Sequence, residues 1–162
     1  MTPAEALASA VVPALSLLPG KMDTPEARVM LLAIGLQESH LTFRRQRPTG
    51  PARGLWQCEQ GTPSSRGGIW GLYLFPSTSS ALADLCAARG ISHDALEIYS
   101  ALEHDDVLAA GCARLLLFTD PKRLPAVDDV SGSWALYQRV WRPGQPRPAE
   151  WGMNHYQARE AV

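Results

Sequence analysis

The sequence has few cysteines and no cluster of metal-binding residues. Its three cysteines, Cys58, Cys86 and Cys112, are widely spaced and form no CxxC pair, and its four histidines form no HExxH motif. An odd number of distant cysteines predicts neither a disulfide framework nor a structural zinc site. We therefore expect three buried free thiols, with no metal and no other cofactor.

An excess of charge of one sign is also missing. Lys and Arg total 15, Asp and Glu total 16, and the formal net charge is -1. Proteins that bind nucleic acid through its phosphates normally carry a strong basic field. We therefore expect no nucleic-acid partner. One local basic cluster, which either attracts an anionic partner or is a solvated face, consists of Arg44, Arg45, Arg47 and Arg53.

No hydrophobic run is long enough to cross a membrane. The apolar N-terminal stretch, residues 6–18, is interrupted by Pro13 and follows Glu5 rather than a basic residue. A transmembrane helix needs about 20 apolar residues, and a signal peptide begins with positive charge. We expect a structural helix kinked at Pro13, synthesis in the cytoplasm without an evident signal peptide, and no stable membrane insertion.

Length and composition predict a single domain, residues 1–162. Hydrophobic residues make up 46% and charged residues 19% of the chain, which is typical of a globular protein. A chain of this length buries about two thirds of its unfolded surface without disulfide or metal support. We expect a monomer.

The hydrophobic periodicity predicts a mainly α fold. A proline near a helix start and apolar residues spaced by three and four indicate a helix that begins near Pro25 and ends near residues 39–41. Residues 42–77 are rich in Gly, Pro, Ser, Thr and Arg and predict a small irregular lobe or a β-hairpin. Further helical patterns cover residues 78–89, 92–102, 105–118, 131–141 and a final stretch from about residue 149.

Glu38 is an ionisable residue in an otherwise apolar part of the chain. It lies near the end of the apolar second helix, directly before the irregular lobe. A carboxyl that faces a cleft and is shielded from water has a raised pKa and stays protonated near neutral pH. A general acid that protonates a glycosidic oxygen needs this property. The alternative, which position alone favours, is an exposed glutamate at a helix end.

Two short motifs occur in order around this residue. Ser39 follows Glu38, and the segment GLWQ at residues 54–57 places Gln57 19 residues after Glu38. This arrangement resembles the soluble lytic transglycosylase and goose-type lysozyme superfamily. In that family a Glu-Ser pair ends a helix and a Gly-Leu-Met-Gln segment follows at nearly this spacing. Trp56 stands here where the family has Met.

The resemblance is weaker further along the chain. Gly111 with Leu115 and Leu116 resembles a family helix that carries a glycine and later leucines. Tyr137 corresponds to the tyrosine of the family's Ala-Tyr-Asn-Ala-Gly motif, but the Asn and Gly of that motif are absent. The resemblance is therefore specific only within residues 37–57.

The resemblance implies a lysozyme-like helical domain that cleaves the β-1,4 bond between N-acetylmuramic acid and N-acetylglucosamine in peptidoglycan. In the transglycosylases one glutamate acts first as acid and then as base, which is the role implied for Glu38. A hydrolase needs a second group that positions water, usually a carboxylate. Glu59 is the first carboxylate after Glu38. The sequence leaves hydrolysis and transglycosylation open, and leaves Glu59 as a base or a solvated side chain.

Five further residues are candidates for binding the substrate, and each has a structural alternative. Ser39, Gln57 and Tyr137 carry groups that can bond a sugar acetamido group or Glu38. The same groups can instead bond the backbone or lie half-buried in a helix. Trp56 and Trp141 offer faces for stacking on a sugar ring, or belong to the core.

The favoured hypothesis is therefore a peptidoglycan-degrading enzyme, a lytic transglycosylase or muramidase, with glycan strands as its partner. The size, the missing signal peptide and the divergence from the family suggest a phage or prophage lysin or a virion component that acts on the bacterial cell wall. One alternative is a catalytically inactive phage structural or cell-wall-binding protein. A nucleic-acid-binding module that uses the basic cluster is the least favoured hypothesis.

Overall fold

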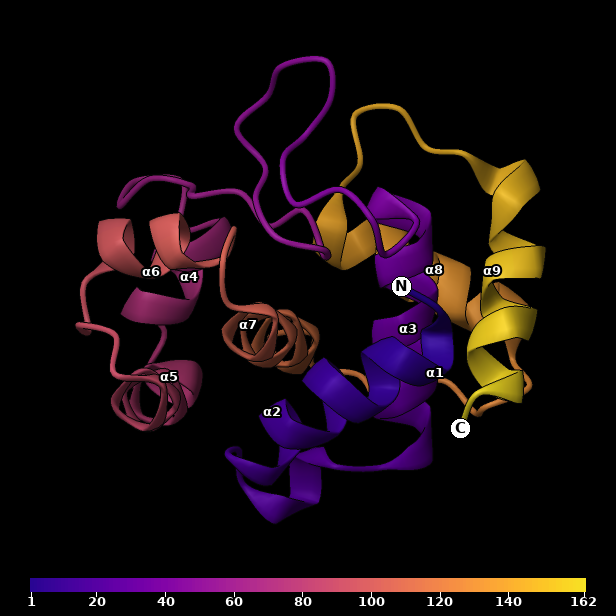
Figure 1. Ribbon diagram of the computed structural model, residues 1–162, viewed down its shortest axis with the longest axis horizontal. Coiled ribbons are helices and arrows are strands. Elements are labelled where there is room, and N and C mark those ends of the chain that lie inside the picture. The colour runs from indigo at the N-terminus through magenta and orange to yellow at the C-terminus, as the bar shows by residue number, and fades with distance from the viewer.

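The computed structural model describes residues 1–162, and helices joined by loops make up almost all of its regular structure. This confirms the mainly α class predicted from the sequence. Figure 1 shows helix α7 (Asp106–Phe118) between two groups of helices. One cluster of 37 buried residues includes side chains from both groups, so the chain folds around a single core. None of the helices is long and apolar enough to span a membrane.

The N-terminal helix is interrupted where the sequence predicts a kink. Helix α1 (Pro3–Ala6) passes into a π-helical turn, η1 (Leu7–Val11), and then into α2 (Val12–Ser16). Pro13 lacks an amide hydrogen, and its ring would clash with a carbonyl in a regular α-helix. The wider turn directly before the proline relieves this conflict. A short 3-10 turn, η2 (Gly20–Met22), then leads to the next helix.

Helix α3 (Pro25–Ser39) carries Glu38 in its last turn. The Thr24 hydroxyl accepts a hydrogen bond from the amide of Ala27, which caps the helix start. The sequence indicated one apolar face, but the helix is buried on almost every side because other helices surround it. Its first turn is partly exposed, and at its C-terminal end Glu38 is partly open to solvent.

The second group of helices contains one element that the sequence analysis missed. Helix α4 (Gly68–Leu74) lies within the stretch predicted to be irregular, and Ile69 and Leu72 anchor it in the core. Its seven residues include Gly68 and Gly71, and glycine has a low helix propensity, so the segment is typical of a loop. The helices α5 (Pro76–Arg89) and α6 (Ala95–Ala101) follow, close to their predicted positions.

The loop between α3 and α4 is irregular, as one of the two alternatives predicted. It contains two isolated antiparallel bridges, Arg45 with Arg53 and Arg53 with Cys58, instead of the paired strands of a β-hairpin. Of the four arginines in the predicted basic cluster, three form ion pairs, with Asp106 or Glu103, at 2.6–3.5 Å. Arg45 and Arg53 share Glu103, so two carboxylates offset part of the positive charge of the four arginines.

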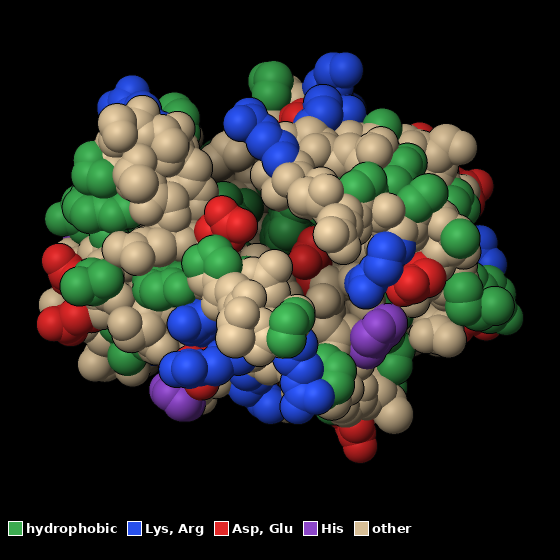
Figure 2. Space-filling model, turned by 90° about the horizontal axis from the view of Figure 1, so that it is seen from above, with side chains coloured by type: hydrophobic (Ala, Val, Ile, Leu, Met, Phe, Trp, Pro, Cys, Tyr) green, Lys and Arg blue, Asp and Glu red, His purple; other side chains and the backbone are tan.

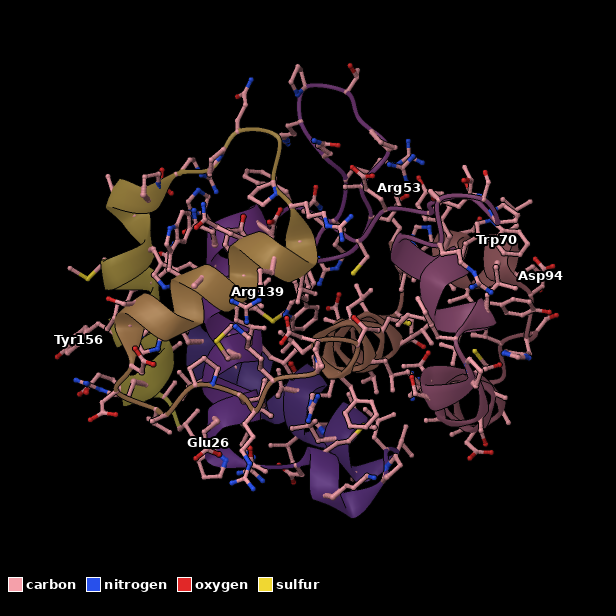
Figure 3. The ribbon with its side chains drawn as sticks, turned by 180° about the vertical axis from the view of Figure 1, so that it is seen from behind. Glu26, Arg53, Trp70, Asp94, Arg139 and Tyr156 are labelled. Carbon is pink, nitrogen blue, oxygen red and sulfur yellow. The ribbon has the colours of Figure 1, made fainter.

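Two C-terminal helices complete the wall beside α3. Helices α8 (Val130–Trp141) and α9 (Pro148–Glu160) lie side by side in Figure 3, with Tyr156 on the outer edge of α9. Helix α9 makes the most extensive helix-to-helix contact in the molecule, and makes it with α3. Trp151 of α9 is 2% exposed and stacks on Tyr137 of α8 at 5.0 Å between ring centroids.

We predict that Trp151→Ala lowers the free energy of unfolding by about 3–5 kcal/mol, because it empties a buried aromatic site. Met153→Ala on the same helix is the matched control, since Met153 is 60% exposed and should change stability by less than about 0.5 kcal/mol. Denaturant unfolding measures both. Equal effects of the two changes would contradict the packing described for α9.

Candidate functional site

A long open cleft runs past the C-terminal end of α3. Its volume is about 1910 Å³, and its walls come from α3, the α3–α4 loop, the end of α8 and the loop over residues 142–147. Figure 2 shows the molecule hollowed on this face, with acidic side chains at the hollow and basic side chains around it. Pockets for small ligands have volumes of about 300–1,000 Å³. This cleft therefore has room for several units of a polymer.

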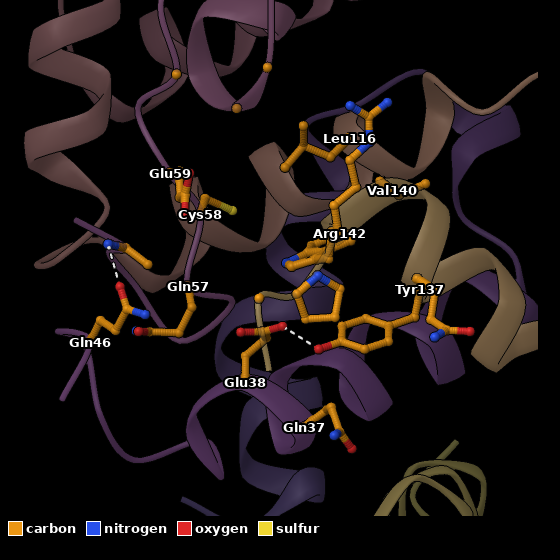
Figure 4. A pocket seen from close by; sticks show the side chains of 18 of the residues that line it. Gln37, Glu38, Gln46, Gln57, Cys58, Glu59, Leu116, Tyr137, Val140 and Arg142 are labelled. Carbon is orange, nitrogen blue, oxygen red and sulfur yellow. Dashed lines mark hydrogen bonds between the residues drawn. The ribbon is translucent and has the colours of Figure 1, made fainter. Parts of the chain in front are cut away.

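Glu38 and Tyr137 meet in this cleft. The Tyr137 hydroxyl donates a hydrogen bond of 2.7 Å to Oε1 of Glu38, across 99 residues of sequence. Figure 4 shows this bond, and shows the other carboxylate oxygen directed toward the side of the cleft where Gln57 lies. No group of the protein bonds Oε2. One oxygen is thus held in place while the other is free for a ligand.

Burial raises the pKa of Glu38 above its ordinary value. The hydrogen bond from Tyr137 and the positive charge of Arg147 lower it, and the negative charge of Glu59 raises it, but burial is the largest influence. The carboxyl therefore holds a proton at a higher pH than an exposed glutamate does. Burial and the nearby Glu38 also raise the pKa of Tyr137, so its hydroxyl remains a donor.

Stacked aromatic rings fix the position of Tyr137. Its ring lies nearly parallel to that of Trp151, at an interplanar angle of 19°. Trp134 contacts it at 5.3 Å and Trp141 at 6.5 Å between centroids. The Tyr137 side chain is only 2% exposed. Its packed ring therefore holds the hydroxyl in a fixed position beside Glu38.

Two of the predicted substrate-binding residues lie outside the cleft. The Ser39 hydroxyl is buried and donates to the carbonyl of Leu55 at 2.6 Å. Trp56 is fully buried, and its indole nitrogen donates to the carbonyl of Leu31 at 2.7 Å. Ser39 thus bonds the backbone and Trp56 belongs to the core. Both hydrogen bonds join α3 to the loop or to the buried ring, and neither residue offers a surface to a sugar.

Gln57 lines the cleft, and hydrogen bonds from its side-chain amide hold it in place. Its side-chain nitrogen donates to the carbonyls of Gly54 at 2.7 Å and Phe43 at 3.2 Å. Its backbone adopts a left-handed conformation with φ of 47°, which few residues other than glycine adopt. These constraints direct the side chain and leave the amide oxygen available to accept a hydrogen bond.

Trp141 and Glu59 also line the cleft. Trp141 is half-buried, and its indole nitrogen donates to the carbonyl of Trp56 at 2.9 Å. Glu59 is exposed, and its carboxylate forms neither a hydrogen bond nor an ion pair within the protein. The structure thus brings Gln57, Glu59, Tyr137 and Trp141 to the same cleft as Glu38.

Arg147 and Gln37 belong to this site and were missed in the sequence. Gln37 is 1% exposed, and its side-chain nitrogen donates to the carbonyl of Arg147 at 3.1 Å. They are 110 residues apart in sequence, and no motif links a proline-rich loop to a helix end. The only signal was that a polar Gln37 precedes Glu38 in an otherwise apolar helix.

The structure contains no group of three or more His, Cys, Asp or Glu side chains arranged to hold a metal ion. All three cysteines are buried free thiols, as expected. Burial raises the pKa of Cys58 to about 12 and that of Cys86 to about 11. These thiols therefore remain protonated, and act as small apolar residues in the core.

We predict that Tyr137→Phe raises the pKa of Glu38, because it removes a hydrogen bond that favours the carboxylate. Titration of the 13C-labelled glutamate carboxyl by NMR measures this shift. Tyr156→Phe on the outer edge of α9 is the control and should leave the titration unchanged. A Glu38 titration that is the same in Tyr137→Phe and wild type would show that the 2.7 Å bond has no electrostatic effect.

Comparisons of the chain with protein-family models, with curated proteins and with solved structures found no match. No relative therefore assigns a role to any residue of the cleft.

Proposed function

We propose that this protein cleaves the β-1,4 glycosidic bond between N-acetylmuramic acid and N-acetylglucosamine in peptidoglycan, with Glu38 as general acid. The observation that carries the proposal is a shielded carboxyl with a raised pKa, bonded to Tyr137 in a long open cleft. The bacterial cell wall is then the place where the protein acts, as a phage or prophage lysin or virion component.

The carboxyl of Glu38 has the features that proton transfer to a glycosidic oxygen requires. In the protonated state Oε2 carries the proton, because Tyr137 already donates to Oε1. The proton passes to the glycosidic oxygen as the bond from that oxygen to C1 of the muramic sugar breaks. The carboxylate that remains is stabilised by Tyr137, whose hydroxyl continues to donate.

Transglycosylation is the reaction that the single shielded carboxyl supports best. The C6 hydroxyl of the muramic sugar attacks C1, its proton returns to Glu38, and a 1,6-anhydro ring closes without added water. An inverting hydrolase would need a second carboxylate held about 6.5–9.5 Å away to position water. Glu59 is exposed and no side-chain hydrogen bond positions it, so nothing in the protein orients it for that role.

The shape and lining of the cleft also favour a glycan strand. The cleft is open to solvent and large enough for several sugar rings. Trp141 offers a half-buried aromatic surface, and Gln57 offers a free amide oxygen that can accept from an acetamido N–H. A polar cleft with a few aromatic side chains suits a sugar polymer better than an apolar ligand.

We predict that Glu38→Gln lowers the release of fragments from purified peptidoglycan by about 10²–10⁴-fold, the usual contribution of a general acid. Mass spectrometry of the digest measures the loss. The wild type should release fragments with anhydromuramic ends, lighter by one water than hydrolysis products. Glu160→Gln, at the exposed end of α9, is the matched control and should retain activity.

The thermal stability of Glu38→Gln shows whether its loss of activity results from unfolding. The folded chain binds the Glu38 proton more tightly than the unfolded chain, so the wild type loses stability as pH rises through the raised pKa. Glu38→Gln lacks this loss and should unfold at the same or a higher temperature at pH 7. Near-normal cleavage by a folded Glu38→Gln protein would contradict the assignment. Absence of fragments from the wild type on several wall types would favour an inactive wall-binding role.

We predict that Glu59→Gln retains fragment release within about tenfold of the wild type, because transglycosylation needs no second carboxylate. The same digests measure the activity and the type of fragment end. A loss as large as that of Glu38→Gln, together with reducing ends in the wild-type products, would indicate a hydrolase in which Glu59 positions water.

A further inference from the structure

The loop over residues 142–147, which joins α8 to α9, is fastened to the last turn of α3 by a pair of hydrogen bonds. The Gln37 side chain donates to the carbonyl of Arg147 at 3.1 Å. The Arg147 guanidinium donates in return to the carbonyl of Gln37. The residue that receives this bond is the direct neighbour of Glu38. Arg147 therefore acts on the same helical turn that presents the proposed acid to the cleft.

The carbonyl that Arg147 binds belongs to the open end of the helix. The last four carbonyls of an α-helix have no partner within the helix, and in α3 (Pro25–Ser39) these include Gln37. The C-terminal end of a helix also carries a partial negative charge. A carboxylate in this turn is disfavoured by that charge, so a cation here both caps the helix and offsets the charge.

A second layer of contacts holds the arginine in place. Asn154 is 8% exposed and donates to the side-chain oxygen of Gln37 at 2.9 Å. A carboxylate oxygen of Glu150, in the first turn of α9, lies 3.4 Å from Nε of Arg147. Helix α9 thus fixes Gln37 from one side and Arg147 from the other. The guanidinium of Arg147 is exposed, and its two partners are the backbone carbonyl of Gln37 and the carboxylate of Glu150.

Few charged or titratable groups surround Glu38. Tyr137 approaches it from α8, Glu59 and Cys58 from the α3–α4 loop, and Arg147 from the loop before α9. Arg147 is the cation among them. Arg142 lines the same cleft, but its Nε donates to the carbonyl of Arg139 at 3.3 Å. Arg142 therefore provides a matched control for charge in the cleft.

We propose that Arg147 is a positioning residue. It caps the end of α3, and its positive charge stabilises the Glu38 carboxylate enough for the carboxyl both to give up its proton and to take it back. This inference rests on the proposed function. Burial, Glu59 and the helix end all oppose ionisation of Glu38. A carboxyl that holds its proton too firmly is a poor acid, because its conjugate base cannot persist between the two proton transfers.

The test compares Arg147→Gln, Arg147→Lys and Arg142→Gln by NMR titration of the Glu38 carboxyl and by the pH profile of peptidoglycan cleavage. In Arg147→Gln the Glu38 titration should move to higher pH, the alkaline limb of kcat/KM should follow it, and kcat should fall about tenfold. Arg147→Lys keeps the charge without the planar fork and should restore most of the titration. Arg142→Gln should change neither the Glu38 titration nor the pH of the alkaline limb of kcat/KM.

Glu150→Gln supplies a test that does not require removing the arginine. Loss of the opposing carboxylate leaves Arg147 more effective, so the Glu38 titration should move to lower pH. An unchanged Glu38 titration in folded Arg147→Gln, or an equal shift in Arg142→Gln, would overturn the inference. If Arg147→Gln does not fold, an unchanged titration in Glu150→Gln would overturn it. If wild type and variants all fail to cleave peptidoglycan, the proposed function fails, while the titrations still decide the role of Arg147.

Discussion

The hydrogen bond between Tyr137 and Glu38 is the interaction on which the site depends. A carboxyl shielded from water is costly to ionise, and the 2.7 Å bond from a rigid hydroxyl offsets part of that cost. The bond also fixes which oxygen faces the cleft. It joins the first half of the chain to the last quarter, so it forms only when α3, α8 and α9 have packed correctly.

The C-terminal helices therefore contribute more than surface to this fold. Trp151 stacks on the ring of Tyr137, and Asn154 bonds the side chain of Gln37. Helix α9 thus supports both residues of the hydrogen bond. It contacts Tyr137 through the ring of Trp151, and it contacts Gln37, the residue before Glu38, through Asn154. Beyond these helices, α4 lines the cleft with Gly68, Gly71 and Leu72, and α7 crosses the core (Figure 1). Within the proposed function, one group of helices carries the acid and the other bounds the substrate cleft.

Sequence reasoning predicted most helices and the central residue of the site, because helix caps and apolar spacing are local signals. The kink at Pro13, the start of α3 and the helix over residues 78–89 all formed close to their predicted positions. Helix α4 was missed because its glycines, Gly68 and Gly71, are typical of a loop. Arg147 was missed because its partner is 110 residues away. Local patterns also could not decide that Ser39 and Trp56 face inward, since burial of a polar group or an aromatic ring is settled by long-range packing.

A crystal structure of Glu38→Gln with a peptidoglycan-derived tetrasaccharide tests the central claim most directly. The account predicts sugar rings along the cleft between the end of α3 and the loop over residues 142–147, with one glycosidic oxygen within hydrogen-bond distance of the substituted side chain. A tetrasaccharide bound on another face of the molecule, or in the cleft with every glycosidic oxygen beyond reach of that side chain, would contradict it.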